Sequence, residues 1–274
     1  MMLYAKQLGE GNAETILFIP GFVGSHEVWD EQFQSLKDQY HLILIDALGF
    51  GHSAKPDIAY SLEEHTNAIR EMVEKFQVTR LHIVGHSMGT LLALAYCYRF
   101  SASVVSLALL SMPFFENEQA AREGVKKSSL FNRLLAMDTP LAHAACTVMC
   151  HLRPLLLPIM PYVVRGVPAL VAKDSIRHTW QSYSRTLQHI IFQASTRQWI
   201  EAARQPVLLL HGTEDKTAPL ANVRNAAQHF ANGRLLEIEK AGHDFIFTHS
   251  RLLVSELRKF FPAFRSDAGS PESI

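Results

Sequence analysis

Cysteine is scarce in this chain, with 3 in 274 residues, and a small odd number in a chain long enough to build a large core favours reduced thiols. An excess of either charge is also lacking, because 26 Lys or Arg balance 26 Asp or Glu and no long basic run occurs. This balance excludes the electrostatic footprint of a nucleic-acid-binding protein. No uninterrupted apolar stretch reaches the roughly 18 residues of a membrane span, and no apolar leader follows Met1, so we expect a soluble, cytoplasmic protein.

Short apolar runs alternate with helix-forming segments along most of the chain. This alternation predicts an α/β fold, in which a mostly parallel central sheet carries helices on both faces. Ser61 and Glu64 form a capping-box pattern that begins a helix running to about Phe76. The predicted strands cover residues 15–19, 42–45, 81–84, 106–110, 207–211 and 235–238.

The N-terminal part of the chain carries two further patterns. The runs over 3–8 and 15–19 flank Gly9-Glu10-Gly11-Asn12, a turn-forming sequence, and together they predict a β-hairpin. A single helix is expected at about 28–37, between the second of these strands and the next.

From residue 113 to residue 204 the strand pattern stops and a helix-forming sequence, broken by prolines, takes its place. We expect a helical cap inserted between the late strands at 106–110 and 207–211. The predicted domains are a core of residues 1–112 and 205–264, a cap of residues 113–204, and a disordered tail of residues 265–274. The cap contains 11 Lys or Arg against 6 Asp or Glu.

Cys146 and Cys150 lie one helical turn apart in this cap, with His143 and His151 nearby, a spacing that a metal site would also use. The apolar spacing around them favours a packed amphipathic helix instead, and we expect no metal. The apolar stripe of that helix comprises Leu141, Ala145, Val148 and Leu152.

The sequence Gly85-His86-Ser87-Met88-Gly89 follows a predicted strand and precedes a helix-forming stretch. On such a strand-to-helix turn the two glycines remove side chains that would collide, and the serine hydroxyl is exposed above the sheet. A chance G-x-S-x-G match is common, so other residues have to support a nucleophile at Ser87.

An acid and a histidine follow in separate loops. Asp215 lies just beyond the strand at 207–211, with Glu214 as a rival, and His243 follows the strand at 235–238. Asp46 also ends a strand, and we expect it to organise its own loop as a hydrogen-bond acceptor. The order serine, acid, histidine above a mostly parallel sheet resembles the α/β-hydrolase superfamily over nearly the whole chain.

The resemblance implies a catalytic triad. Ser87 is then the nucleophile and His243 its general base, while Asp215 fixes the imidazole tautomer and stabilises the imidazolium. The oxyanion hole is expected from the backbone N–H groups of Phe22 and Met88. Pro20 stands where relatives often carry histidine, which removes a side chain that could brace this loop. The reaction needs no cofactor and no metal.

Substrate choice is expected to lie in the cap, whose most apolar part covers residues 155–164. One hypothesis is a lipophilic acyl or aromatic pocket, with membrane or micelle contact aided by Arg153 and Arg165. The alternative, weighed equally, is that this segment packs onto the main domain. The candidate pocket residues are Phe114, Phe115, Trp180 and Trp199, although aromatic residues at such positions are more often in the core.

The predicted function is hydrolysis of a carboxylic ester, or of a thioester, through an acyl-enzyme. Ser87 argues against dehalogenases and epoxide hydrolases, which use an aspartate at this position. Asp244 and Phe245 follow the histidine where carbon–carbon hydrolases commonly carry tryptophan, which lowers that alternative without removing it. An acyltransferase or perhydrolase using the same triad stays open, and so does a non-catalytic ligand-binding protein.

Overall fold

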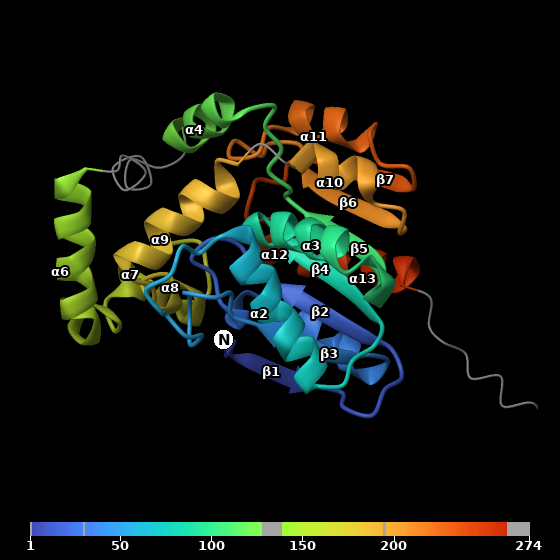
Figure 1. Ribbon diagram of the computed structural model, residues 1–274, viewed down its shortest axis with the longest axis horizontal. Coiled ribbons are helices and arrows are strands. Elements are labelled where there is room, and N and C mark those ends of the chain that lie inside the picture. The colour runs from blue at the N-terminus through green and yellow to red at the C-terminus, as the bar shows by residue number, and fades with distance from the viewer. Residues whose placement is uncertain (1, 30, 128–138, 194–195, 262–274) are drawn as a thin grey trace, which may run out of the picture.

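The computed structural model describes residues 2–29, 31–127, 139–193 and 196–261 (Figure 1). Within these residues, strands of one 7-stranded sheet run in the order β1-β3-β2-β4-β5-β6-β7. Every neighbouring pair is parallel except β1 with β3, so the predicted mostly parallel sheet is confirmed. The strands are β1 (Ala5–Leu8), β2 (Thr15–Ile19), β3 (His41–Ile45), β4 (Leu81–His86), β5 (Val104–Leu110), β6 (Val207–Gly212) and β7 (Gly233–Ile238).

The predicted hairpin between β1 and β2 is wrong. β1 pairs antiparallel with β3, with Ala5 opposite Ile45, while β2 lies between the parallel strands β3 and β4. All five residues of β2 are buried, whereas those of β1 are half-buried. A fully apolar strand belongs in the centre of a parallel sheet and a half-polar one at its edge, which is the physical reason for this order.

Alternate residues of the strands supply two separate cores. Leu17, Ile83 and Leu209 point to one face of the sheet, and their neighbours Phe18, Val84 and Leu210 point to the other. The first face is covered by α2 (Leu62–Lys75), α3 (Met88–Arg99), α10 (Thr196–Ala202) and α11 (Leu220–Ala227). The second is covered by α1 (Glu31–Gln34), η2 (Ser35–Asp38), α12 (Phe245–Thr248) and α13 (Ser250–Phe260). Figure 1 shows α2 and α3 in front of the sheet and α13 behind it.

Hydrogen bonds between side chains and the backbone explain where one helix begins and why another predicted helix is broken into short pieces. The predicted capping box is confirmed, since Ser61 Oγ accepts from the Glu64 N–H and the Glu64 carboxylate accepts from the Ser61 N–H. The single helix predicted at about 28–37 is instead the series η1 (His26–Val28), α1 and η2. Side chains compete for its carbonyls there, because Gln34 donates to the Trp29 carbonyl and Ser35 donates to that of Gln32.

Described helices, and no described strand, lie between β5 and β6. In Figure 1 most of them form a group beside the sheet, whereas α10 packs on α3 within the main core. The division into core and cap at residues 113 and 204 stays a prediction, and the predicted tail of residues 265–274 lies outside the described residues. These helices, besides α10, are α4 (Glu118–Lys127), α6 (Pro140–Leu156), α7 (Met160–Val163), α8 (Ala169–Asp174), α9 (Trp180–Thr186) and η4 (Leu187–Ile191); η3 (Ser101–Ser103) precedes β5.

The apolar stripe expected to pack α6 is exposed, and that prediction is wrong. Leu141 is 75% exposed, Val148 55% and Leu152 45%. The helix turns another stripe of small residues inward instead, because Ala142 and Cys146 are buried and Cys150 Sγ donates to the His178 carbonyl at 3.2 Å. Small side chains allow α6 to approach the segment before α9 closely, which leaves the larger ones outside. In the described part of the chain, no helix has both the length and the apolar character needed to cross a bilayer.

Candidate active site

Ser87 lies on the sharp turn between β4 and α3. Its φ of 50° and ψ of −121° are unusual for a residue with a side chain and cost about 1–3 kcal/mol, a cost that the surrounding packing has to offset. The glycines on either side make the turn fit. A Cβ on Gly85 would lie 2.6 Å from the Gly89 carbonyl oxygen, and one on Gly89 would lie 2.2 Å from that of Ile19. The predicted reason for both glycines is thus confirmed.

The structure brings Ser87, His243 and Asp215 together. His243 Nε2 lies 2.9 Å from Ser87 Oγ, and His243 Nδ1 lies 2.8 Å from Asp215 Oδ2. A carboxylate next to Nδ1 favours the tautomer that carries its proton there, which leaves Nε2 free to accept the serine proton. Asp215 lies 28 positions before His243 in the sequence, and Ser87 lies 156 positions before it. The three residues meet because each follows one of the strands β4, β6 and β7, whose carboxyl ends lie at the same edge of the sheet.

Asp215 and its rival Glu214 have different environments. The Asp215 side chain is fully buried, and its Oδ1 accepts from the N–H groups of Thr217 at 2.9 Å and Ala218 at 2.8 Å. Burial raises the pKa of Asp215, but hydrogen bonds from His243 and Ala218 and the charge of His243 outweigh it and lower the pKa. Glu214 is exposed, so the acid that contacts His243 is Asp215.

Two residues that the sequence analysis missed hold the His243 loop. Ser111 Oγ donates to the His243 carbonyl at 2.8 Å, and His86 Nε2 lies 3.2 Å from the same oxygen. Burial lowers the pKa of His86 to about 4, so its ring is neutral and donates without adding charge near the base. A signal for His86 existed, because it is the variable residue before Ser87 in the turn motif. Ser111 follows the end of β5 as Ser87 follows β4, and both have a φ of 50°.

The loop after β2 lies directly against the nucleophile. A Cβ on Gly21 would lie 3.2 Å from Ser87 Cβ, so a larger residue there would press on the nucleophile turn. Met88 is the first residue of α3, where a backbone N–H has no acceptor within the helix. These positions are compatible with Phe22 and Met88 as oxyanion donors, and that role stays a proposal.

A family model described as the alpha/beta hydrolase fold matches residues 14–250.
The chain belongs to this family.
The resemblance inferred from the turn motif and the order of the three residues is thereby confirmed. Membership of the alpha/beta hydrolase family identifies the chain as a hydrolase-fold protein and leaves the substrate open.

Two plant proteins are among the curated relatives. One named "Probable lysophospholipase BODYGUARD 3", from Arabidopsis thaliana, is 30% identical over 258 residues, which covers 84% of this chain and 52% of the relative. Another named "Probable lysophospholipase BODYGUARD 4", from the same plant, is 43% identical over 107 residues, which covers 38% of this chain and 26% of the relative. The chain spans about half the length of the curated relatives it matches.

Solved structures share the architecture at low identity. An esterase from Exiguobacterium antarcticum superposes with a TM-score of 0.73 at 17% identity, and 94% of each chain is covered. An enol-lactonase from Burkholderia xenovorans gives a TM-score of 0.71 at 22% identity, covering 94% of this chain and 95% of the other. At these identities the likeness supports the alpha/beta hydrolase fold alone.

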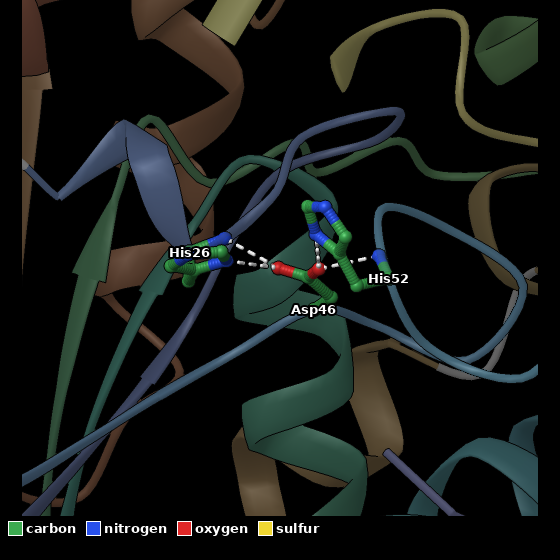
Figure 2. A group of neighbouring side chains, drawn as sticks. All are labelled: His26, Asp46 and His52. Atoms are coloured by element: carbon green, nitrogen blue, oxygen red, sulfur yellow. Dashed lines mark hydrogen bonds and ion pairs between the residues drawn. The ribbon is translucent and has the colours of Figure 1, made fainter. Parts of the chain in front are cut away.

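A second cluster of ionisable residues surrounds Asp46 (Figure 2). Asp46 Oδ1 accepts from the His26 backbone N–H at 2.6 Å and lies 2.8 Å from His26 Nδ1, and Oδ2 accepts from the His52 N–H at 2.6 Å and lies 3.1 Å from His52 Nδ1. The prediction that Asp46 organises its loop as an acceptor is confirmed. Ligand atoms of all three lie within 4.8 Å, close enough for a metal, but backbone N–H groups already occupy both carboxylate oxygens.

The charges of this cluster support one another. Burial opposes ionisation of both partners, yet the hydrogen bond and charge of Asp46 raise the pKa of His26 above 6.5. Hydrogen bonds from His26 and His52 likewise lower the pKa of the buried Asp46 below 3.8. The cluster therefore joins the loops after β2 and β3.

The four candidate pocket residues fall into two groups. Phe114 and Trp199 are 3% and 4% exposed and belong to the main core, where a packing role is sufficient to explain them. Phe115 and Trp180 pack against a smaller apolar cluster of α4, α6, α9 and η4 residues, which Phe22 also contacts. Phe22 packs against the main core as well, so this contact does not separate the two groups, and a pocket role for any of the four stays a prediction.

Proposed function

We propose that this chain is a serine hydrolase that cleaves carboxylic ester bonds through an acyl-enzyme. One observation carries the proposal: Ser87, His243 and the buried Asp215 form a continuous hydrogen-bonded series on the nucleophile turn. A serine with no adjacent base is a poor nucleophile at neutral pH, and this arrangement supplies both the base and the group that orients it.

The geometry supports a two-step reaction. Ser87 Oγ attacks the acyl carbonyl carbon while His243 Nε2 takes its proton, and Asp215 stabilises the imidazolium that forms. The N–H groups of Met88 and Phe22 are proposed to bind the developing oxyanion. His243 then protonates the leaving alcohol, and in the second step takes a proton from the water that attacks the acyl-enzyme. A thioester would use the same residues, and the reaction needs no cofactor or metal.

We further propose a fairly lipophilic small substrate, as for a carboxylesterase or lipase-like enzyme. The apolar cluster that Phe22 contacts supports this, because its side chains offer apolar surface beside the expected oxyanion hole. The plant relatives named as probable lysophospholipases support it too, since such substrates carry acyl chains. We place the protein in the cytoplasm, a proposal supported by its three free cysteines.

A fluorophosphonate probe followed by peptide mapping tests the nucleophile and its activation together. We expect one labelled peptide, with the adduct on Ser87, and loss of labelling in the His243→Ala variant. A folded protein that takes no label, or takes it elsewhere, would contradict the proposal.

Substrate preference needs a separate measurement. The rate constants for p-nitrophenyl esters should rise from acetate to longer acyl chains, because a lipophilic pocket buries more apolar area with each methylene. A flat or falling profile would contradict the proposed lipophilic pocket but not the proposed ester hydrolysis. Product analysis with competing alcohols would distinguish hydrolysis from acyl transfer.

A further inference from the structure

Exposed apolar side chains concentrate on one region of the molecule. Of the 12 large hydrophobic residues that are exposed in the described part of the chain, 8 lie between Leu141 and Leu170. We call this region the outer face of α6–α8. It is defined by Leu141, Val148, Leu152, Leu155, Tyr162 and Leu170. Single exposed hydrophobics are ordinary on a soluble protein, whereas a cluster of this size marks an interaction site.

The helical spacing makes this surface continuous along α6. Leu141, Val148, Leu152 and Leu155 are separated by 7, 4 and 3 positions, which places them in one stripe along the helix. The inward stripe contains the buried Cys146, so the helix has one face packed and a different, apolar face exposed. In Figure 1 α6 is the element farthest from the sheet among the labelled helices on its side of the molecule.

The charge of the same segment has one sign. Residues 139–173 contain Arg153, Arg165 and Lys173 but neither Asp nor Glu. Arg153 donates to the carbonyls of Ile176 and His178, so it serves the fold rather than the surface. In the described part of the chain no ion pair involves the exposed Arg165, which follows α7, or the half-buried Lys173 of α8, so the segment after α6 carries two cations without an ion-pair partner.

The nearest acid along the chain does not oppose these cations. Asp174 is 5% exposed, accepts from Ser25 Oγ at 2.7 Å and pairs with Arg177 at 2.7 Å. Its charge is therefore directed into the protein, toward the loop after β2. The outer face combines apolar side chains, unpaired cations and a lack of exposed carboxylates.

We propose that the outer face of α6–α8 docks onto an anionic lipid surface. A bilayer boundary takes up apolar side chains while its anionic headgroups attract lysine and arginine, so one partner satisfies both properties. A second copy of this chain fits less well, since two such faces would bring like charges together.

The same helix connects the surface to the candidate site. Ala142, on the inner side of α6, belongs to the apolar cluster that Phe22 contacts beside Ser87. A lipid surface at the outer side would then lie next to the site where a lipophilic ester is cleaved, an extension that rests on the proposed function. Docking itself requires no catalysis and can be tested without it.

Vesicle sedimentation tests docking in the full chain carrying Ser87→Ala, which prevents hydrolysis of the lipid. Vesicles of phosphatidylcholine alone are compared with vesicles in which phosphatidylserine replaces about three lipids in ten. We expect binding to the mixed vesicles to exceed binding to the neutral ones and to weaken as salt is raised.

A matched pair of double variants locates the surface. Leu141→Glu with Leu155→Glu should reduce binding at least about tenfold, because two apolar anchors become anions facing an anionic surface. Tyr98→Glu with Leu252→Glu, at exposed hydrophobics of α3 and α13, should bind as the parent does. Thermal unfolding of each variant verifies that it remains folded.

Three results would overturn the proposal: no binding by the parent, equal binding by the two double variants, or a dimer in analytical ultracentrifugation that only the α6 variant separates. The last would assign the face to a second copy. Labelling of Ser87 in the otherwise unchanged chain reports on the proposed function independently. Labelling without vesicle binding rejects docking alone, and binding without labelling rejects the hydrolase alone.

Discussion

Two apolar helices of this protein, α3 and α6, have opposite surroundings. In α3, 10 of 12 residues are buried, whereas in α6 the buried residues of 17 are Ala142 and Cys146. The sequence of each is rich in leucine and alanine, so hydrophobicity by itself does not decide which one is covered. What decides is position, because α3 packs between the sheet, α2 and α10, while α6 lies beyond the sheet and contacts α9 along one side.

The difference in burial gives the two helices different roles. α3 begins at the nucleophile turn, and its close packing keeps Ser87 in a backbone conformation that a loose helix would relax. α6 has little to hold in place and presents its apolar side outward. Substitutions should therefore act on chemistry and stability near α3, and on surface binding near α6.

The largest expected effect is at the start of α3. Ser87→Ala should reduce ester turnover by about 10⁴-fold or more, because no other group can form the acyl-enzyme, with thermal unfolding nearly unchanged. Steady-state rates with a p-nitrophenyl ester and a calorimetric scan measure both. Residual turnover within tenfold of the parent would assign the reaction to a different nucleophile.

Asp215→Asn should reduce turnover by about 10³- to 10⁴-fold, since an amide no longer favours the tautomer in which His243 Nε2 accepts a proton. Glu214→Gln is the matched control. Its side chain is exposed, and it should leave the rate within about twofold of the parent. A loss of equal size in both variants would mean that the acid had been misassigned.

Much of this site could be predicted from the sequence, because its parts have local signatures. The turn at Ser87 needs glycine on both sides, and Asp215 and His243 each follow a buried strand. The turn motif contains His86, but neither its role nor that of Ser111 could be predicted, since both hold the His243 carbonyl across more than a hundred residues of chain. A contact of this kind depends on how strands are ordered in the sheet, which the spacing of apolar residues does not encode.

The next effect is on stability, where Asp46 joins the loops after β2 and β3. Asp46→Asn should lower the free energy of unfolding by about 3 kcal/mol, because buried N–H donors and the His26 ring lose their ionised acceptor. Denaturant titration measures it. Asp57→Asn, at an ion pair whose aspartate is 74% exposed, is the control and should change stability by less than about 1 kcal/mol.

The same variant has a defined pH dependence. The lowered pKa of Asp46 gives stability that is present above its ordinary 3.8 and lost as the pH falls through the folded value. The raised pKa of His26 gives stability that is present below 6.5 and lost as the pH rises through its folded value. The difference between parent and variant should thus be largest between these two values, and a difference that grows above pH 6.5 would contradict the pairing.

Gly89→Ala should destabilise the protein by about 1–3 kcal/mol, because the added Cβ would meet the Ile19 carbonyl oxygen at 2.2 Å and force α3 away from β2. Gly242→Ala provides the comparison, since a Cβ there has no neighbour within 4 Å among the described residues. Thermal unfolding of the two variants measures the difference. Equal stability would mean that the contact between α3 and β2 relaxes freely.

The fold could be predicted to about the same extent as the site. Its prediction also failed where a position is decided by contacts between segments far apart in the sequence. Strands that are buried on both faces read as continuous apolar runs, so the parallel sheet was evident. The pairing of β1 with β3, and the exposure of the apolar stripe on α6, depend on which element happens to be adjacent. Leu141 and Leu94 are the same residue type in helices of similar composition, yet they are 75% and 1% exposed.

The smallest expected effect follows from that contrast and tests it directly. Leu155→Glu should change the free energy of unfolding by no more than about 0.5 kcal/mol, because the side chain is 68% exposed and buries little apolar area on folding. Leu94→Glu, the matched change on α3, should prevent folding, since it would place an unpaired carboxylate in the core. If Leu155→Glu also lowered stability by several kcal/mol, α6 would have to pack its apolar side in solution. The outer face would then be part of the protein's interior, and a lipid surface would have no exposed apolar stripe to bind.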